Sequence, residues 1–212
     1  MSNPFAKVCL RQLPGNIFQS AIDEKSIAIE SRDDQRVYYS VFNLFDGELV
    51  AELSPEEITP WHGLHSIQDQ FLILQYFENK KNPDSINYFR LDLTNEKLEE
   101  IDEPRIELPT PRVPSMFLDN SSEFETVKQF IGSDLVLGCE YDEFGEYIII
   151  TSYYQQHSDG LSRHLLVLYD GEEKYHEIQD GDLKGFAPGS FFTYQNRLIF
   201  VRDKTEINIY EI

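Results

Sequence analysis

The side chains best suited to binding or chemistry lie in two short segments. The first is Trp61-His62-Gly63-Leu64-His65, which holds the only tryptophan and two of the five histidines. The second is Tyr153-Tyr154-Gln155-Gln156-His157, in which two aromatic residues lead to a histidine. Aromatic rings and imidazoles at the mouth of a loop can stack on a ligand. We therefore expect a ligand-binding site built from Trp61, His62, His65, Tyr153, Tyr154 and His157.

The same residues also have a simpler structural interpretation, and no metal site or cofactor is predicted. His62 and His65 are three residues apart, a spacing that shares one face of a helix but not of a strand. Pro60 comes just before them and Gly63 lies between them, which argues against a helix. The alternative is a packing tryptophan with structural or exposed histidines. In the second segment, the alternative is a packed Tyr153 and a solvated histidine.

Acidic residues form two further groups that could carry chemistry. Glu140, Asp142, Glu143 and Glu146 cluster around a predicted hairpin turn, where paired carboxylates exchange protons if one of them is buried. In a turn we expect them to be solvated instead. Asp180-Gly181-Asp182 lacks the acid spacing of a full calcium loop, so turn chemistry explains it better. The sequence contains no nucleophile elbow, phosphate loop or dinucleotide fingerprint.

Composition limits the class of protein and of partner. A chain of 212 residues with 41% apolar residues is large enough to bury a core, and we predict a single domain, 1–212. There are 38 acidic and 18 basic residues, a formal net charge of −20, which disfavours nucleic acids and anionic membranes as partners. The acidity serves solubility or, alternatively, attracts a basic partner or a cation.

Two cysteines and the N-terminal residues bear on the cellular compartment. Cys9 and Cys139 are too few for a disulfide framework. Residues 1–7 have no apolar core of the signal-peptide type, and no stretch approaches about 18 consecutive apolar residues. We therefore expect a cytoplasmic protein without a membrane-spanning helix. The sequence does not predict an oligomeric state.

The chain consists of similar hairpins. Sliding it by 76 residues brings 71–77 onto 147–153 and 89–96 onto 165–172, so two apolar strands and one turn coincide. Asp-Gly and Asn residues in these turns accept the positive φ that tight hairpins require. A further strand precedes each hairpin. Each unit is therefore predicted to contain four short strands.

These four-stranded units predict an all-β fold. Central strands such as 148–150 and 165–168 are apolar on both faces, as expected for strands sandwiched between sheets. Sheets that cannot bury both faces alone stack radially in a β-propeller. We therefore predict a small β-propeller-like ring of four antiparallel blades. The last unit lacks its fourth strand, and we expect 7–11 to supply it beside 207–212 and close the ring.

The segment 102–133 interrupts the repeat. Its first part is acidic and rich in proline, which argues against a central strand. Ser122 and Glu125 fit a capping box and Gly132 fits a helix end, so one short helix is predicted near 123–131. The alternative is that this segment contains a degenerate fifth blade.

The order of aromatic-rich hairpins resembles an uncharacterised bacterial family, a domain of unknown function with propeller-like repeats. Residues 123–128 and 149–154 carry the resemblance, which spans most of the chain. It implies a propeller-like fold and no particular activity. Trp-Asp blade endings and double-glycine kelch elements are absent from the sequence.

The predicted connections between strands are long on one face of such a ring and short on the other. Long loops on a rigid scaffold are where binding residues collect. The sequence therefore favours a non-enzymatic binding or scaffold module that presents its loop-rich face to a protein, peptide or small ligand. The alternative is a hydrolase-type enzyme with a site at the central opening, formed by loop carboxylates with Trp61, His62 and His157.

Overall fold

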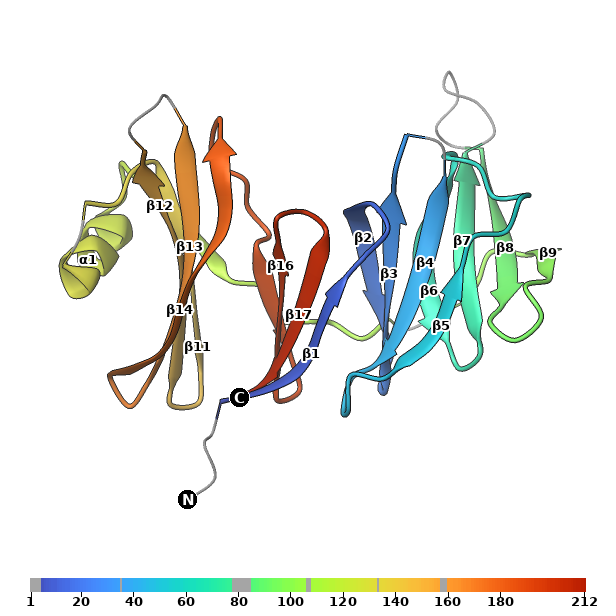
Figure 1. The fold of residues 1–212 in the computed structure, drawn as a ribbon, viewed down its shortest axis with the longest axis horizontal. Coiled ribbons are helices and arrows are strands. Elements are labelled where there is room, and N and C mark those ends of the chain that lie inside the picture. The colour runs from blue at the N-terminus through green and yellow to red at the C-terminus, as the bar shows by residue number, and fades with distance from the viewer. Residues whose placement is uncertain (1–4, 35, 78–84, 106–107, 133, 157–159) are drawn as a thin grey trace. The chain divides into compact units, whose positions relative to one another are not determined.

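A computed structural model describes residues 5–34, 36–77, 85–105, 108–132, 134–156 and 160–212. These residues form antiparallel β-sheets and one short α-helix, so the predicted all-β class is confirmed (Figure 1). The chain divides into two compact units. Unit 1 comprises 1–7, 112–204 and 210–212, and unit 2 comprises 8–111 and 205–209. Each unit is described by itself, and the single domain stays a prediction.

Unit 2 contains two four-stranded antiparallel sheets. The first has the order β2-β3-β4-β5, formed by Asn16–Ile22, Ser26–Arg32, Val37–Asn43 and Leu49–Leu53. The second has the order β6-β7-β8-β9, formed by His62–Gln68, Phe71–Phe77, Ile86–Asp92 and Leu98–Ile101. Each sheet therefore has the four consecutive strands predicted for one unit.

The two sheets of unit 2 share one apolar core. Tyr39 and Val41 of β4 belong to the same buried cluster as Leu64 of β6 and Leu72 and Leu74 of β7. All five side chains are fully buried. Alternate residues of a strand point to the same face, so the spacing of these residues directs them into one layer between the sheets.

Unit 1 contains a five-stranded antiparallel sheet. Its order is β10-β11-β12-β13-β14, formed by Ser115–Leu118, Gly138–Phe144, Tyr147–Gln155, Leu161–Tyr169 and Glu172–Leu183. The hairpin of β15 (Phe191–Tyr194) and β16 (Arg197–Arg202) shares a core with it. Ile149 and Val167 face this core and are fully buried. We call this side of the five-stranded sheet its inner face.

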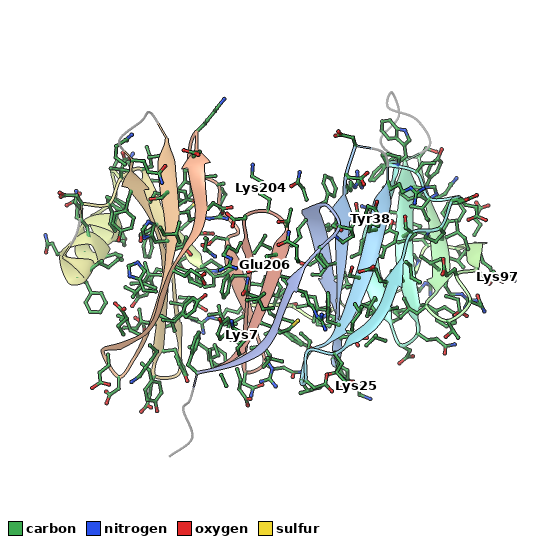
Figure 2. All side chains as sticks on the ribbon, in the orientation of Figure 1. Lys7, Lys25, Tyr38, Lys97, Lys204 and Glu206 are labelled. Atoms are coloured by element: carbon green, nitrogen blue, oxygen red, sulfur yellow. The ribbon has the colours of Figure 1, made fainter. Side chains whose placement is uncertain are left out.

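The N-terminal strand lies beside the last strand, as expected for 7–11 and 207–212. The strand β1 (Ala6–Gln12) is hydrogen-bonded to β17 (Glu206–Glu211). Within unit 1, the ring of Phe5 stacks on that of Tyr210 at 4.5 Å between ring centres. The ammonium group of Lys7, which Figure 2 labels, lies 5.8 Å from the Tyr210 ring centre. The closed ring of blades stays a prediction.

The segment 102–133 forms no sheet of its own among the described residues. It provides β10, an edge strand that pairs with β11, followed by the helix α1 (Ser122–Ile131). The alternative of a fifth blade is therefore not supported. Pro114 directly precedes β10, a position that proline tolerates because the residue before a strand need not donate to the ladder.

The helix α1 is confirmed, but its first residue was assigned one position late. Ser121, not Ser122, is the N-cap, and its hydroxyl accepts the Phe124 N–H at 3.1 Å. Gly132 ends the helix as predicted, with a φ of 71° in the left-handed region. No helix in the described part of the chain is long and apolar enough to cross a bilayer.

Hairpin turns follow the predicted chemistry in some places and not in others. Asp170 and Gly171 both have positive φ, as a two-residue hairpin turn requires. The hairpin turn predicted among the acidic residues 140–146 is shorter than expected, because β11 runs to Phe144 and only Gly145 and the next residue turn. The turn predicted at 180–182 is wrong, since β14 continues through these residues.

Candidate functional site

The segment around His62 lies in unit 2 at the start of β6. His62 itself is buried, and its ring packs on Tyr76 at 4.6 Å and on Phe89 at 5.5 Å between ring centres. Its Nδ1 accepts the backbone N–H of Thr59 at 3.1 Å and is therefore unprotonated. Trp61, one residue before the strand, is 41% exposed. The structure thus places His62 in a packed position and leaves Trp61 accessible.

His65 does not share the surroundings of His62. It lies at an irregular position of β6, where the register shifts between Leu64 and Ser66. Its Nδ1 is 3.2 Å from the Ser66 hydroxyl, and its ring meets that of Tyr88 edge-on at 5.5 Å. Among the residues that the structure covers, no group of three or more metal-ligating side chains occurs.

A buried ion pair holds the His62 segment in place. Glu30 on β3 is fully buried and accepts the Leu64 N–H at 2.6 Å. Its charge partner Arg32 also donates to two backbone carbonyls, at 3.0 Å to Pro60 and 3.3 Å to His62. This pair therefore links the first sheet of unit 2 to the connection that leads into the second.

Burial lowers the pKa of His62 below its ordinary value of 6.5. The unfolded chain then takes up a proton more readily than the folded chain, so acidification through pH 6.5 favours unfolding. We expect the free energy of unfolding to fall as the pH drops below 6.5, and to fall less steeply in His62→Gln. Urea titrations at several pH values check this. If the free energy of unfolding falls equally steeply with pH in the unchanged protein and in His62→Gln, another group causes the pH dependence.

The second predicted segment splits between the two faces of β12 in unit 1. Tyr153 is buried on the inner face, where its hydroxyl donates to the Ala187 carbonyl at 2.8 Å. Tyr154 points to the opposite, outer face, and its ring lies 4.5 Å from that of His164. His157 lies outside the described residues. The alternation of a strand therefore separates two residues that the sequence analysis grouped together.

Two of the predicted turn carboxylates are buried structural groups, which corrects the expectation that all are solvated. Glu140 accepts the N–H groups of Gly189 and Ser190 at 2.6 and 3.2 Å. Asp142 pairs with Arg112 at 2.6 Å. These carboxylates face β15 or the segment before it, and their donors satisfy them. Glu143 and Glu146 are exposed, as predicted.

Asp180 is likewise a buried structural group. It forms an ion pair with Arg163 on the neighbouring strand β13. Burial is the main cause that raises the pKa of Asp180, and the arginine opposes it. The guanidinium of Arg163 also donates to the Ala187 carbonyl at 3.2 Å. The pair therefore belongs to the inner face of the five-stranded sheet, together with Tyr153.

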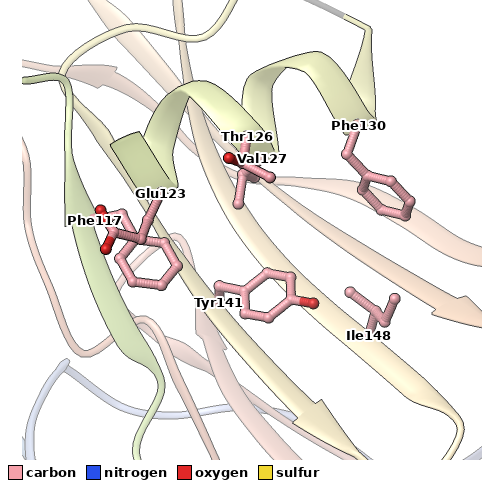
Figure 3. A pocket seen from close by; sticks show the side chains of 7 residues that line it. All are labelled: Phe117, Glu123, Thr126, Val127, Phe130, Tyr141 and Ile148. Atoms are coloured by element: carbon pink, nitrogen blue, oxygen red, sulfur yellow. The ribbon is translucent and has the colours of Figure 1, made fainter. Parts of the chain in front are cut away.

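An apolar hollow lies on the outer face of this sheet, beneath α1. Its volume is about 330 Å³ (Figure 3). Side chains from three strands and the helix line it: Phe117 of β10, Tyr141 of β11, Ile148 of β12, and Glu123, Thr126, Val127 and Phe130 of α1. We call this space the helix hollow.

The amphipathic sequence of α1 produces the helix hollow. Phe124 and Val127 are three residues apart, so they share one helix face and pack in a buried cluster with Cys139 and Ile150 of the sheet. Phe130 continues this face toward the end of the helix but is 54% exposed. The aromatic ring of Phe130 therefore lies at the edge of an apolar space and is only partly buried.

A second hollow of about 540 Å³ lies on the other side of Phe130. His164 of β13 and His176 of β14 line it, together with Tyr154, Leu166 and Leu168 of the sheet. We call it the histidine hollow. Of the predicted site residues that the structure describes, Tyr154 alone lines one of these two hollows.

The polar groups of the two hollows differ. The helix hollow has the Glu123 carboxylate and the hydroxyl of Tyr141, whose pKa rises to about 12 through burial and a hydrogen bond to Glu143. In the histidine hollow, burial lowers the pKa of His164, and the neighbouring His176 adds to this effect. Both hollows have a carboxylate in their lining, Glu123 in the helix hollow and Glu173 in the histidine hollow, and the second also has the imidazoles of His164 and His176.

The sequence contains separate indications of this outer-face site, but the sequence analysis did not connect them. Phe130 follows Val127 by three residues, which extends the apolar face of the predicted helix. Tyr154 ends the strand predicted before it, and His164 directly precedes the predicted strand 165–168, which the structure extends to Leu161–Tyr169. Which strand face the helix covers depends on the chain path through 108–132, and no local pattern specifies that path.

Comparisons with known proteins assign no family. No family model matches the sequence, and no curated protein matches it. Among solved structures, the chain is similar to BamB from Moraxella catarrhalis, with 8% identity over 92% of this chain and 84% of that chain and a TM-score of 0.29. So low a TM-score carries no argument about fold or function. The resemblance to an uncharacterised bacterial family stays a prediction.

Proposed function

We propose that this protein is a non-enzymatic binding module that takes one apolar side chain of a basic peptide segment into the helix hollow. The helix hollow is the observation that carries the proposal. Its volume of about 330 Å³ lies in the range of ligand pockets, and five of its lining side chains are apolar or aromatic: Phe117, Val127, Phe130, Tyr141 and Ile148. One aromatic or large aliphatic side chain is the occupant that fits such a lining.

Charge supports a basic rather than an acidic partner. The Glu123 carboxylate lines the helix hollow, and Glu125 lies exposed on the same first turn of α1. The whole chain has a formal net charge of −20. Lysine or arginine residues that flank the inserted side chain meet complementary charge, which speeds association and selects the partner.

The lining of the helix hollow favours binding over catalysis. It contains one carboxylate and neither an imidazole nor a thiol. The Thr126 hydroxyl donates to the Ser122 carbonyl at 2.9 Å within the helix. Nucleophilic catalysis needs a nucleophile beside a base, which this set of side chains lacks.

The hydrolase alternative has no specific support from the described residues. It placed Trp61, His62 and His157 beside loop carboxylates at a central opening. The Nδ1 of His62 is occupied by the Thr59 N–H, and the ring lies among aromatic side chains. The predicted loop-rich site, with Trp61 and His65, and the cytoplasmic location stay proposals from the sequence.

Short labelled peptides test the proposal directly. We expect a peptide with a central Phe or Trp between lysines to bind, and the same peptide with flanking glutamates to bind at least tenfold more weakly. Fluorescence anisotropy gives both affinities. Phe130→Ser should weaken binding of the lysine peptide by about tenfold, because loss of aromatic burial costs at least about 1.5 kcal/mol.

A matched control tests whether peptide binding depends on the helix hollow or on exposed apolar side chains in general. Val113 lies in the same unit, is 70% exposed and lines neither hollow on the outer face. Val113→Ser should leave the affinity for the lysine peptide unchanged. Equal weakening by both substitutions, or stronger binding of the glutamate peptide, would show that the helix hollow is not the site.

A further inference from the structure

We infer that His164 and His176 form a binding site for one late first-row divalent metal ion, such as Zn²⁺ or Cu²⁺. The two residues lie on adjacent antiparallel strands, where His164 pairs with Ile178 and Leu166 pairs with His176. They are therefore diagonal neighbours on the outer face of the five-stranded sheet. The inference is independent of the peptide that we propose for the helix hollow.

The distance between the two rings supports metal binding. His164 Nδ1 and His176 Nε2 are 3.3 Å apart. Zinc binds histidine nitrogen at about 2.0–2.1 Å with tetrahedral angles, so two such ligands lie about 3.3 Å apart. A hydrogen bond from a nitrogen donor usually spans about 2.7–3.2 Å. The two nitrogens thus already have the separation of two ligands on one ion.

Neighbouring side chains fix the His164 ring in this orientation. Its other nitrogen, Nε2, is 2.9 Å from the Ser162 hydroxyl, which directs Nδ1 toward His176. The Tyr154 ring packs against the imidazole at 4.5 Å between ring centres. Metal-binding histidines generally have such a partner on the second nitrogen, because it sets the tautomer and the ring orientation.

Water completes the coordination in this arrangement. Since the described residues include no group of three or more metal-ligating side chains, this part of the chain provides two ligands, His164 and His176. The site opens into the histidine hollow of about 540 Å³, which has room for water on the remaining positions. His176 is exposed, so the ion reaches it from solvent. Two protein ligands predict an affinity in the micromolar rather than the nanomolar range.

Calorimetric titration of the tag-free full chain with Zn²⁺ at neutral pH tests the inference. We expect one ion per chain, and more than about tenfold weaker binding in His164→Gln and in His176→Gln. Cu²⁺ should bind more tightly than Zn²⁺, because affinities for nitrogen ligands rise to copper in the divalent series. Ser162→Ala should weaken binding while both ligands remain.

His65→Gln is the matched control, since His65 is also partly exposed but lies in the other unit. This variant should bind Zn²⁺ as the unchanged protein does. Circular dichroism of the metal-free variants verifies the fold. Absence of Zn²⁺ binding overturns the inference, and so does binding that survives both His164→Gln and His176→Gln or that His65→Gln weakens equally.

Discussion

Replacing Arg32 by alanine is expected to lower the free energy of unfolding by about 3–5 kcal/mol, the usual cost of removing one partner from a buried ion pair. Glu30 is fully buried, and its carboxylate would keep only the Leu64 N–H as a close donor. The two carbonyls that Arg32 binds, of Pro60 and His62, would lose their donor as well. Urea unfolding followed by circular dichroism measures the effect.

Arg90→Ala is the matched control for this prediction. Arg90 pairs with Glu99 at 2.8 Å, but the two side chains are 42% and 38% exposed. Exposed pairs contribute about 1 kcal/mol or less. The double variant Glu30→Gln, Arg32→Met should be more stable than Arg32→Ala, since it leaves no buried charge. Similar small losses in Arg32→Ala and Arg90→Ala would contradict a structural role for the Glu30 pair.

Phe124→Ala is expected to destabilise unit 1 by about 3–5 kcal/mol and to abolish peptide binding at the helix hollow. Phe124 is 2% exposed and packs with Val127, Cys139 and Ile150, so its loss leaves a cavity beneath α1. The helix has few other buried side chains to hold it on the sheet. Hydrogen exchange of the α1 amides measures the local loss of stability, and urea unfolding measures the global loss.

Phe130→Ala separates an effect on peptide binding from an effect on stability. Phe130 is 54% exposed, so its removal should change the stability by about 0.5 kcal/mol or less. Binding of the lysine peptide should nevertheless weaken, because Phe130 lines the helix hollow. If Phe124→Ala leaves both the exchange of α1 and the peptide affinity unchanged, then α1 does not form the site.

The sequence by itself determined most of the strands and the helix. The central strand β7 occupies the predicted residues 71–77, and β12 and β13 include the predicted apolar runs 148–150 and 165–168. Hydrophobic runs and positive-φ turn residues are local signals, because a strand and its hairpin partner lie close in the chain. The short helix near 123–131 was predictable for the same reason.

Tertiary structure alone decided which polar residues are buried. Glu140 and Asp142 were expected in a solvated turn, but β11 extends through them and turns their side chains toward β15. The partners that satisfy them, Ser190 and Arg112, are 50 and 30 residues away in the chain. A local pattern contains no information about such distant donors.

The candidate site likewise combines residues that the sequence predicted with residues that only the tertiary structure brought together. Tyr154 was predicted, while its neighbours His164, His176 and Phe130 were not, because they come from β13, β14 and α1. Side chains alternate along a strand, so the local sequence specifies which residues share a face. It does not specify which other element packs on that face. The sequence therefore determined the elements, and only the packing of α1 on the sheet created the two hollows.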